Sequence, residues 1–353
     1  MLRSVKDCLG IEGRYHHHPP VLPDGRALES GVTVVIPTWN GAGLLAACLG
    51  CVAAQELRPS RTLVVDNAST DATEEVVRGF QGIHLTRLAE NVGYSGALAS
   101  VFSQVRTAYV AVLNNDARPE PDWLSRLARH LDTGPRRGCA FPLTVREDGT
   151  IDTAGDLITL AGFGYKRGHR CRDLSPAPAG VLVCAPGVAP LYRTAAVVAA
   201  GGWDPGLHSQ WDDLDLGIRL WLLGWDSILD EGVRVVHYQG SSSSRRVRTR
   251  EFLAARNEMV VLLKTMPPGV CALMAPAHVS YLALSLCSHI IQGTAPAFLA
   301  GKAAGIASLG AIIAARRRLT PSRTLHVRQL DRRWMRVWWG LSRLGGRHAP
   351  GVP

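Results

Sequence analysis

The chain lacks an apolar leader at its start and lacks the paired cysteine motifs that hold zinc. Residues Met1 to Asp7 mix charged and apolar side chains, so we expect no secretory signal. The eight cysteines are scattered, and the Cys-x-x-Cys pair of Cys48 and Cys51 lies in an apolar, helix-like run without a second pair. We interpret the cysteines as packing residues of a reduced, cytosolic chain, with redox or metal chemistry as the alternative for that pair.

Acidic residues are scarce near the C-terminal end. The whole chain has a formal net charge of +10. Between Arg316 and Arg347 there are ten arginines and one acid, Asp331, which is a local charge of +9 and leaves +1 for the rest. A basic tail on a nearly neutral body predicts an anionic surface as partner, either lipid or nucleic acid.

Charged residues are also absent between Lys264 and Lys302. Residues 272–291 of this stretch are about long enough to span a bilayer, although Pro276 and two histidines weaken that interpretation. Residues 330–344 place leucine and tryptophan on one helical face with arginine beside it, a pattern typical of helices that lie in a membrane interface. We predict peripheral attachment to a membrane; a true span and ordinary packing or oligomer contacts are the alternatives.

From Val32 onward the chain alternates between apolar runs and helical patterns. Strands are predicted at 32–36, 62–66, 83–86 and 109–113, and helices at 42–55, from 71 and at 95–106. Buried strands that alternate with helices indicate βαβ units and a mostly parallel α/β sheet. Ligands of such sheets bind beyond the carboxyl ends of the strands, where Asp66, Asn115 and Asp116 stand.

Acids and a histidine recur at such ends. Asp116 follows one apolar strand and His237 ends another, while Asp212, Asp213 and Asp215 open a helical pattern with an apolar stripe. Carboxylates stabilise helix N-termini, so capping alone accounts for an acidic start. Together the three elements predict a metal-assisted site that transfers a group from a diphosphate.

Several short blocks stand in a fixed order along the chain. They are VVIPTWN (Val34–Asn40), VVDNASTD (Val64–Asp71), ENVGYSG (Glu90–Gly96), LNND (Leu113–Asp116), DDLD (Asp212–Asp215) and HYQGS (His237–Ser241). In this order they resemble a family 2 glycosyltransferase of the GT-A fold, in the rhamnosyltransferase-like branch of bacterial polysaccharide assembly.

The resemblance covers residues 32–265 and implies an α/β, Rossmann-like GT-A domain with a mostly parallel sheet flanked by helices. It divides the chain into an N-terminal arm (1–31), the GT-A glycosyltransferase domain (32–265) and a C-terminal amphipathic, membrane-associating helical region with a basic tail (266–353). The block after Gly96 departs from the family, because Ala97 to Ala99 stand where a further glycine and an asparagine are usual.

The resemblance assigns nucleotide binding to the first four blocks. The implied residues are Pro37, Thr38, Asn40, Asp66, Asn67, Asn91, Gly93 and Asn115. Asp66 has no helix to cap, and a carboxylate can accept the imide N–H of uracil or thymine, which suits a UDP- or dTDP-linked sugar. The glycines let backbone approach the nucleotide.

The resemblance also assigns the chemistry. Asp213 matches the catalytic base, which takes the proton of the acceptor hydroxyl in a single inverting displacement. Asp116 and His237 match the ligands of a divalent cation, Mg²⁺ or Mn²⁺. Residues expected on or behind the acceptor side are Gly187, Trp203, Trp211, Asp212 and Asp215. Asp215 is also expected to pair with Arg219, four residues on.

The implied protein is an inverting, metal-dependent glycosyltransferase at the cytoplasmic face of the cell membrane. It moves a sugar, rhamnose being one choice, from a nucleoside diphosphate to a lipid-linked or polysaccharide acceptor in cell-surface glycan assembly. The alternatives are a polyprenyl-phosphate sugar synthase, a non-enzymatic scaffold and a nucleic-acid-binding protein. We expect no nucleic acid, because the tail arginines alternate with tryptophan and leucine instead of forming one phosphate-tracking face.

Overall fold

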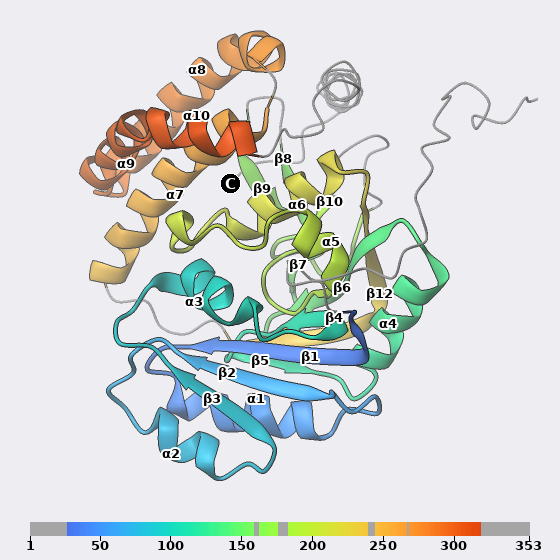
Figure 1. Ribbon diagram of the computed structural model, residues 1–353. Coiled ribbons are helices and arrows are strands. Elements are labelled where there is room, and N and C mark those ends of the chain that lie inside the picture. Colours follow the sequence, from blue (N-terminus) through green and yellow to red (C-terminus); the bar gives the residue numbers. More distant parts are fainter. Residues whose placement is uncertain (1–26, 159–161, 176–182, 239–243, 267, 319–353) are drawn as a thin grey trace, which may run out of the picture.

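The apolar runs form the centre of a nine-stranded main sheet (Figure 1). The computed structural model describes residues 27–158, 162–175, 183–238, 244–266 and 268–318. Along the sheet the order is β3-β2-β1-β4-β11-β6-β12-β5, and β7 pairs with β6. The strands are β1 (Glu29–Thr38), β2 (Arg61–Asp66), β3 (Ile83–Arg87), β4 (Thr107–Val112), β5 (Ala117–Pro119), β6 (Arg137–Val145), β7 (Ile151–Thr153), β11 (Leu191–Arg193) and β12 (Asp226–His237). A smaller antiparallel sheet holds β8 (Asp156–Ile158), β9 (Gly164–Lys166) and β10 (Val183–Cys184).

The predicted parallel half is confirmed. Strands β3, β2, β1 and β4 run parallel, and α1 (Ala42–Ala53), α2 (Thr73–Arg78) and α3 (Gly93–Phe102) connect them in turn. After α4 (Trp123–Thr133) the sheet becomes mixed, because β11 enters antiparallel between β4 and β6. The pairing of β12 with β5 sets His237 opposite Ala117, so His237 stands beside Asp116 although 120 residues separate His237 and Ala117.

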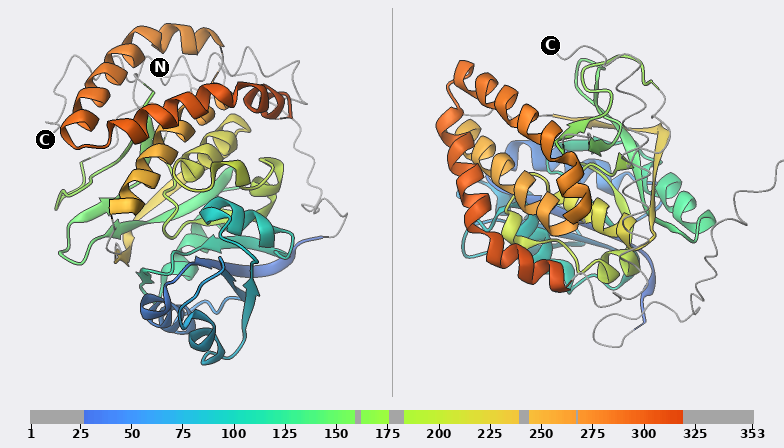
Figure 2. Two further views of the ribbon diagram at one scale, coloured as in Figure 1. Left: turned by 90° about the vertical axis from the view of Figure 1, so that its left-hand side faces the viewer. Right: turned by 90° about the horizontal axis from the view of Figure 1, so that it is seen from above.

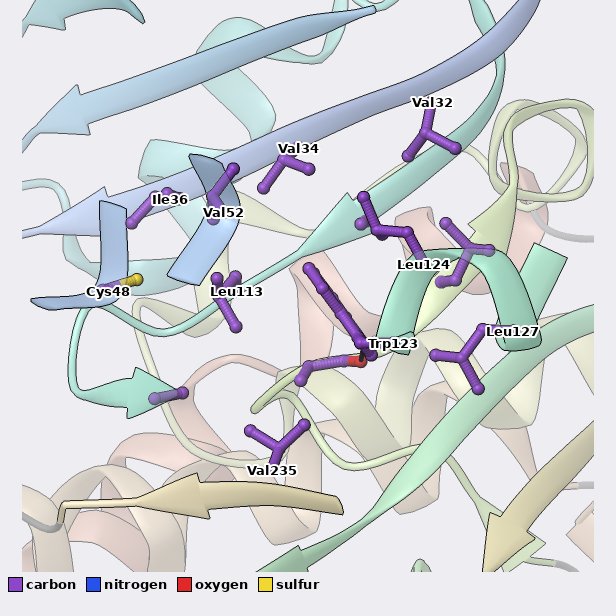
Figure 3. Packing of buried hydrophobic residues seen from close by; sticks show 14 of the residues in the cluster. Val32, Val34, Ile36, Cys48, Val52, Leu113, Trp123, Leu124, Leu127 and Val235 are labelled. Atoms are coloured by element: carbon purple, nitrogen blue, oxygen red, sulfur yellow. Dashed lines mark hydrogen bonds between the residues drawn. The ribbon is translucent and has the colours of Figure 1, made fainter. Parts of the chain in front are cut away.

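Both faces of β1 are buried, which explains its continuous apolar run. Val34 and Ile36 point to the face covered by α1 and α4, and Val35 points to the face covered by α3. Trp123 fills the first of these layers and donates its indole N–H to the Ala189 carbonyl at 2.9 Å (Figure 3). The indole proton is thereby satisfied inside the core.

The second half of the chain is largely helical. It contains α5 (Thr194–Ala199), a short 3₁₀ turn η1 (Pro205–Leu207), α6 (Asp212–Leu222), α7 (Ser244–Thr265), α8 (Pro268–Ile291), α9 (Ala295–Ala307) and α10 (Leu309–Arg318). Helices α7 to α10 gather at the end of the molecule opposite β3 and α2 (Figures 1 and 2). The amphipathic pattern expected at 330–344 lies outside the described residues.

Helix α8 leaves much of its apolar surface exposed. Leu284 is 72% and Ile291 is 86% accessible. The window Met274–Ile291 is long and apolar enough to cross a membrane, and α9 with α10, bent by 54°, passes the same test as a pair. By length and composition alone, one described helix therefore qualifies as a span, or two if the bent pair is one.

Several boundaries differ from the sequence prediction. β1 begins at Glu29 rather than Val32, because the Glu29 N–H donates to the Arg106 carbonyl immediately before β4. Helix α3 begins at Gly93 rather than Ser95. The glycine- and proline-rich segment 139–190 contains most of the nine-residue strand β6 and four short strands. These strands form by pairing with other segments of the chain, which local sequence does not reveal.

Candidate active site

The turn after β1 is built by side chains from three strand ends. Asn115 donates to the Thr38 hydroxyl at 2.8 Å, and Thr38 in turn accepts the backbone N–H of Asn67 on its carbonyl. Asn40 adopts a positive φ of 49° and its side-chain oxygen accepts the Thr70 N–H at 2.7 Å. The expected nucleotide residues Pro37, Thr38, Asn40, Asp66, Asn67 and Asn115 therefore meet at one edge of the sheet.

Asp66 is completely buried at the end of β2. Its Oδ1 accepts the Ser69 N–H at 2.8 Å, which closes the turn. Within the described part of the chain its Oδ2 has no hydrogen-bond partner and lies 3.6 Å from Arg87 Nη1. A buried acceptor left unused costs free energy, so this oxygen is suited to a ligand donor.

Asn67 and Asn91 shape the glycine turn that opens α3. Asn67 accepts the Val92 N–H at 2.9 Å and donates to the Gly93 carbonyl at 3.0 Å, and Asn91 accepts the Gly93 N–H at 2.9 Å. Gly93 has a φ of 80°, and a Cβ there would lie 2.1 Å from His208 Nδ1. Only glycine fits this position.

Asp116 and His237 lie together, as the metal-ligand prediction requires. His237 Nε2 is 3.2 Å from Asp116 Oδ1, a spacing that two neighbouring ligands of one Mg²⁺ or Mn²⁺ ion can adopt. Among the residues described, no cluster of three or more His, Cys, Asp or Glu side chains is arranged to hold a metal. The pair would hold a divalent cation only together with oxygen ligands from outside these two side chains.

Asp152 on β7 lies next to the Asp116–His237 pair and was not predicted. The fully buried Asp152 carboxylate accepts from His237 Nδ1 at 2.9 Å and from Lys166 Nζ at 3.0 Å. Burial opposes the charge of Asp152, but the bonds from His237 and Lys166 prevail and lower its pKa to about 2. Burial likewise opposes the charge of His237, but Asp116 and Asp152 raise its pKa to about 9 in the absence of a metal. Asp152 thus orients the imidazole so that Nε2 faces Asp116.

Asp213 stands at the start of α6, and each of its carboxylate oxygens accepts a backbone N–H. Its Oδ2 accepts the Gly187 N–H at 3.1 Å, and the Gly187 carbonyl accepts the Tyr94 hydroxyl at 2.6 Å. Tyr94 belongs to the glycine block of α3. The backbone of Gly187 therefore joins Asp213, the expected base, to the Glu90–Gly96 block, which we call the donor block.

Other carboxyl groups surround Asp213. Burial and then the Asp213 charge raise the pKa of Asp212 well above its usual range. The same two causes, in the same order, raise the pKa of Asp156, a buried residue of β8. Burial raises the pKa of Tyr94, and the charges of Asp212, Asp213 and Asp116 add to that effect. The site is acidic, which favours a divalent cation.

Two of the residues expected on or behind the acceptor side, Trp203 and Asp215, are buried. The ring of Trp203, 6% exposed, meets Phe102 and Tyr192 edge to face, so Trp203 packs in the core. Asp215 is fully buried and pairs with Arg219 at 2.7 Å, as its spacing predicts. Trp211 and Gly187 remain beside Asp213, at the start of α6 and across the Gly187 hydrogen bond.

The structure brings together the residues predicted around Thr38 and the residues predicted as metal ligands, Asp116 and His237. It also places three further residues at the site. Asp152, Asp156 and Tyr94 were missed, because Asp152 and Asp156 stand in a segment without periodic pattern and Tyr94 reads as one aromatic within a glycine turn. The only local signal was a pair of acids four positions apart between Thr150 and Leu157.

The fold and the acidic strand-end site define a nucleotide-sugar-dependent class of enzyme, the GT-A glycosyltransferases. Among solved structures, the chain is similar to the S. aureus TarS 1-349 fragment in complex with UDP-GlcNAc, with a TM-score of 0.53 and 15% identity over 92% of this chain and 94% of that one. It is also similar to GalNAc-T7 with UDP, GalNAc and Mn²⁺, with a TM-score of 0.52 and 16% identity over 66% of this chain and 47% of that one. At such identities the likeness concerns the fold.

Sequence comparison places the chain within that class. Residues 33–182 match the profile of Glycosyl transferase family 2. An N-acetylglucosaminyl-diphospho-decaprenol L-rhamnosyltransferase of Mycobacterium tuberculosis is 26% identical over 240 residues, 60% of this chain and 77% of that one. Residues 33–182 thus carry the sequence features of family 2 glycosyltransferases, and the chain is similar to a rhamnosyltransferase.

Proposed function

We propose that this glycosyltransferase transfers a sugar of the rhamnose type from a UDP- or dTDP-linked donor to a lipid-linked acceptor, with inversion, at the cytoplasmic face of the membrane. The observation that carries the proposal is the Gly187 peptide, which ties Asp213 to the donor block through Tyr94. The acceptor class is supported by the M. tuberculosis relative, whose name specifies rhamnosyl transfer to a diphospho-decaprenol-linked sugar.

The reaction is a single displacement at the anomeric carbon. Asp213 takes the proton of the acceptor hydroxyl while that oxygen forms its bond to the anomeric carbon, and the bond from that carbon to the diphosphate oxygen breaks. The Gly187 N–H holds Oδ2, and the Leu214 N–H contacts Oδ1 at 2.8 Å, so the carboxylate is oriented before substrate arrives. Attack from the face opposite the leaving group inverts the sugar.

The diphosphate accumulates negative charge as it leaves. A divalent cation bound by Asp116 and His237 would neutralise that charge. The protein residues prepare this position, since Asp152 fixes the His237 ring and Lys166 neutralises part of the Asp152 charge.

The donor site is tested by titrating UDP, dTDP, GDP and ADP into the purified full chain with Mn²⁺ and again with EDTA. We expect UDP or dTDP to bind in the presence of Mn²⁺ and at least about tenfold more weakly in EDTA, because the cation bridges the diphosphate to Asp116 and His237. Calorimetry gives both constants. Absence of binding for all four nucleotides in a folded sample would remove the transferase proposal and favour a scaffold.

Membrane attachment is assigned to the exposed apolar surface of α8. We expect the double variant Leu284→Glu and Ile291→Glu to lower the fraction that floats with phosphatidylcholine–phosphatidylglycerol vesicles about tenfold or more. The reason is that two exposed apolar side chains, which would enter the bilayer, become charged. The matched control, Ala54→Glu with Gln81→Glu, adds the same charge at exposed positions near α1 and α2. Equal flotation of both variants and wild type would show that α8 does not form the membrane surface.

A further inference from the structure

The loop that leads into the catalytic helix has an unfavourable backbone. His208, Gln210 and Trp211 all have positive φ angles, of 62°, 67° and 66°. Residues with a Cβ rarely adopt this region, and three in four positions do not persist without outside support. Asp212 and Asp213 follow immediately, so the position of the base depends on whatever holds this loop.

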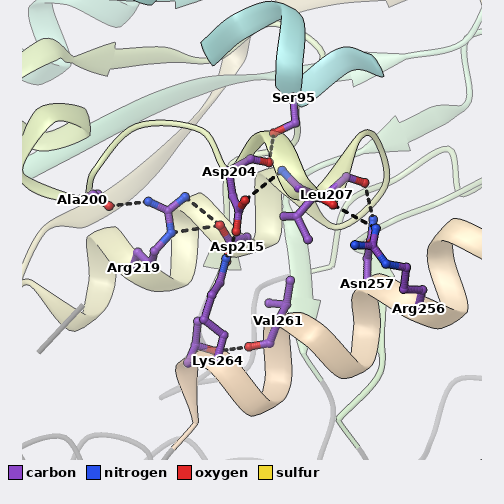
Figure 4. Close-up of polar contacts among 12 residues, drawn as sticks. Ser95, Ala200, Asp204, Leu207, Asp215, Arg219, Arg256, Asn257, Val261 and Lys264 are labelled. Atoms are coloured by element: carbon purple, nitrogen blue, oxygen red, sulfur yellow. Dashed lines mark hydrogen bonds and ion pairs between the residues drawn. The ribbon is translucent and has the colours of Figure 1, made fainter. Parts of the chain in front are cut away.

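Asn257 on α7 supplies that support. Its side chain is completely buried, and Nδ2 donates to the Leu207 carbonyl at 2.7 Å (Figure 4). Nδ2 also donates to the carbonyl oxygens of Ser209 and Gln210 at 2.8 and 2.9 Å. The adjacent Arg256 donates to the Gly206 carbonyl at 2.9 Å. The two amide hydrogens of Asn257 are thus shared among three loop carbonyls, of which the Leu207 carbonyl also accepts the Ser209 N–H.

Lys264 holds the segments on both sides of the loop. Its buried ammonium lies 2.7 Å from Asp204 Oδ2, before the loop, and 2.5 Å from Asp215 Oδ1, within α6 (Figure 4). Lys264 is seven residues after Asn257, about two turns along the same face of α7. Side chains on one face of α7 therefore bind the chain before, within and after the strained loop.

We propose that Asn257 and Lys264 are positioning residues that fix Asp213 for proton transfer through the loop 207–211. Their hydrogen bonds and ion pairs go to the loop and its flanking segments and not to Asp213, so they act on the base through the loop. The loop also borders α3, where the His208 carbonyl accepts the Ser95 N–H. The proposal rests on the role of Asp213 proposed above. It also gives α7 a part in catalysis.

The first test is Asn257→Ala in the full chain, with Arg250→Ala as control. Arg250 is an exposed residue of the same helix that pairs with the adjacent Glu251. We expect hydrogen exchange of amides 207–215 to rise about tenfold in Asn257→Ala and to stay at the wild-type rate in Arg250→Ala. With dTDP-rhamnose and an N-acetylglucosaminyl-diphospho-lipid, kcat is expected to fall about 10–100-fold, with KM for the donor within about twofold.

A rescue separates positioning from general packing. Glycine adopts positive φ without strain, so Gln210→Gly in the Asn257→Ala background is expected to restore kcat about threefold. Gln210 is exposed, and this change alters no buried packing. A variant that lost structure around α7 would gain nothing from it. Absence of rescue, or loss of donor binding in parallel with kcat, would overturn the positioning role.

Lys264→Met and Lys264→Arg provide the second pair of variants if Asn257→Ala does not fold. We expect Lys264→Met to lower kcat about tenfold at unchanged donor KM and Lys264→Arg to retain most activity, since it keeps the charge between Asp204 and Asp215. Wild-type kcat in Lys264→Met would contradict the proposal. If the wild type itself transfers no sugar, the proposed function fails, whereas the exchange rates of amides 207–215 still report whether α7 holds the loop.

Discussion

Replacing Asp213 by asparagine is expected to lower kcat of sugar transfer about 10²–10⁴-fold, because a general base contributes that much and an amide cannot take the proton. Asparagine keeps the shape of the side chain, and its carbonyl oxygen can still accept the Gly187 N–H. Binding of UDP or dTDP should stay within about twofold, since the nucleotide residues lie on other strand ends. Steady-state transfer and calorimetry measure the two effects separately.

The matched control is Asp226→Asn, which removes an exposed carboxylate at the start of β12. It is expected to transfer sugar at the wild-type rate. If Asp213→Asn kept kcat within about tenfold of wild type, the base would have to be another carboxyl. Asp156 would then be the first to examine, because it is the unpredicted acid beside Asp213.

Replacing Asp116 by alanine is expected to abolish the Mn²⁺-dependent part of nucleotide binding and to lower transfer by at least about 10³-fold, because one of the two proposed protein ligands of the cation is lost. Asp152→Asn should have an intermediate effect, about 10–100-fold on Mn²⁺ affinity, since it disturbs the orientation of His237 without removing a ligand. Paramagnetic resonance of bound Mn²⁺, titrated with and without UDP, measures affinity independently of turnover.

Glu147→Gln is the control for Asp152→Asn, because it removes an exposed acid just before β7. It should bind Mn²⁺ as the wild type does. Wild-type Mn²⁺ affinity in Asp116→Ala would exclude the strand-end pair as the metal position. Wild-type affinity in Asp152→Asn alone would limit Asp152 to a structural role.

Much of the fold could be read from the sequence, because the relevant signals are local. β1, β2 and β4 are apolar runs bounded by turn residues, and the helices between them carry clear patterns. Asp66, Asp116 and Asp213 were identifiable as candidates, since each stands where a strand ends or a helix begins. The polar network around Thr38, Asn67 and Asn115 follows from the parallel pairing of these same strands.

The remaining site residues could not be read in this way. Asp152 reaches His237 across 85 positions, and Asn257 reaches the Leu207 carbonyl across 50. Trp203 looked like an acceptor residue beside an acidic helix, but its neighbours Phe102 and Tyr192 place it in the core. Each of these outcomes depends on contacts between distant segments, which carry no periodic or spacing signal.

By itself, the sequence determined the α/β class, the positions of the parallel strands along the chain and the acids that follow those strands. These features depend on hydrophobic periodicity and on the residues at strand ends, which are properties of short segments. The tertiary structure alone decided which carboxylate orients His237, which peptide holds Asp213 and which helix supports the strained loop before it. The physical reason is that a buried polar group takes its partner from whatever the packing brings within about 3 Å, and packing is a property of the whole chain.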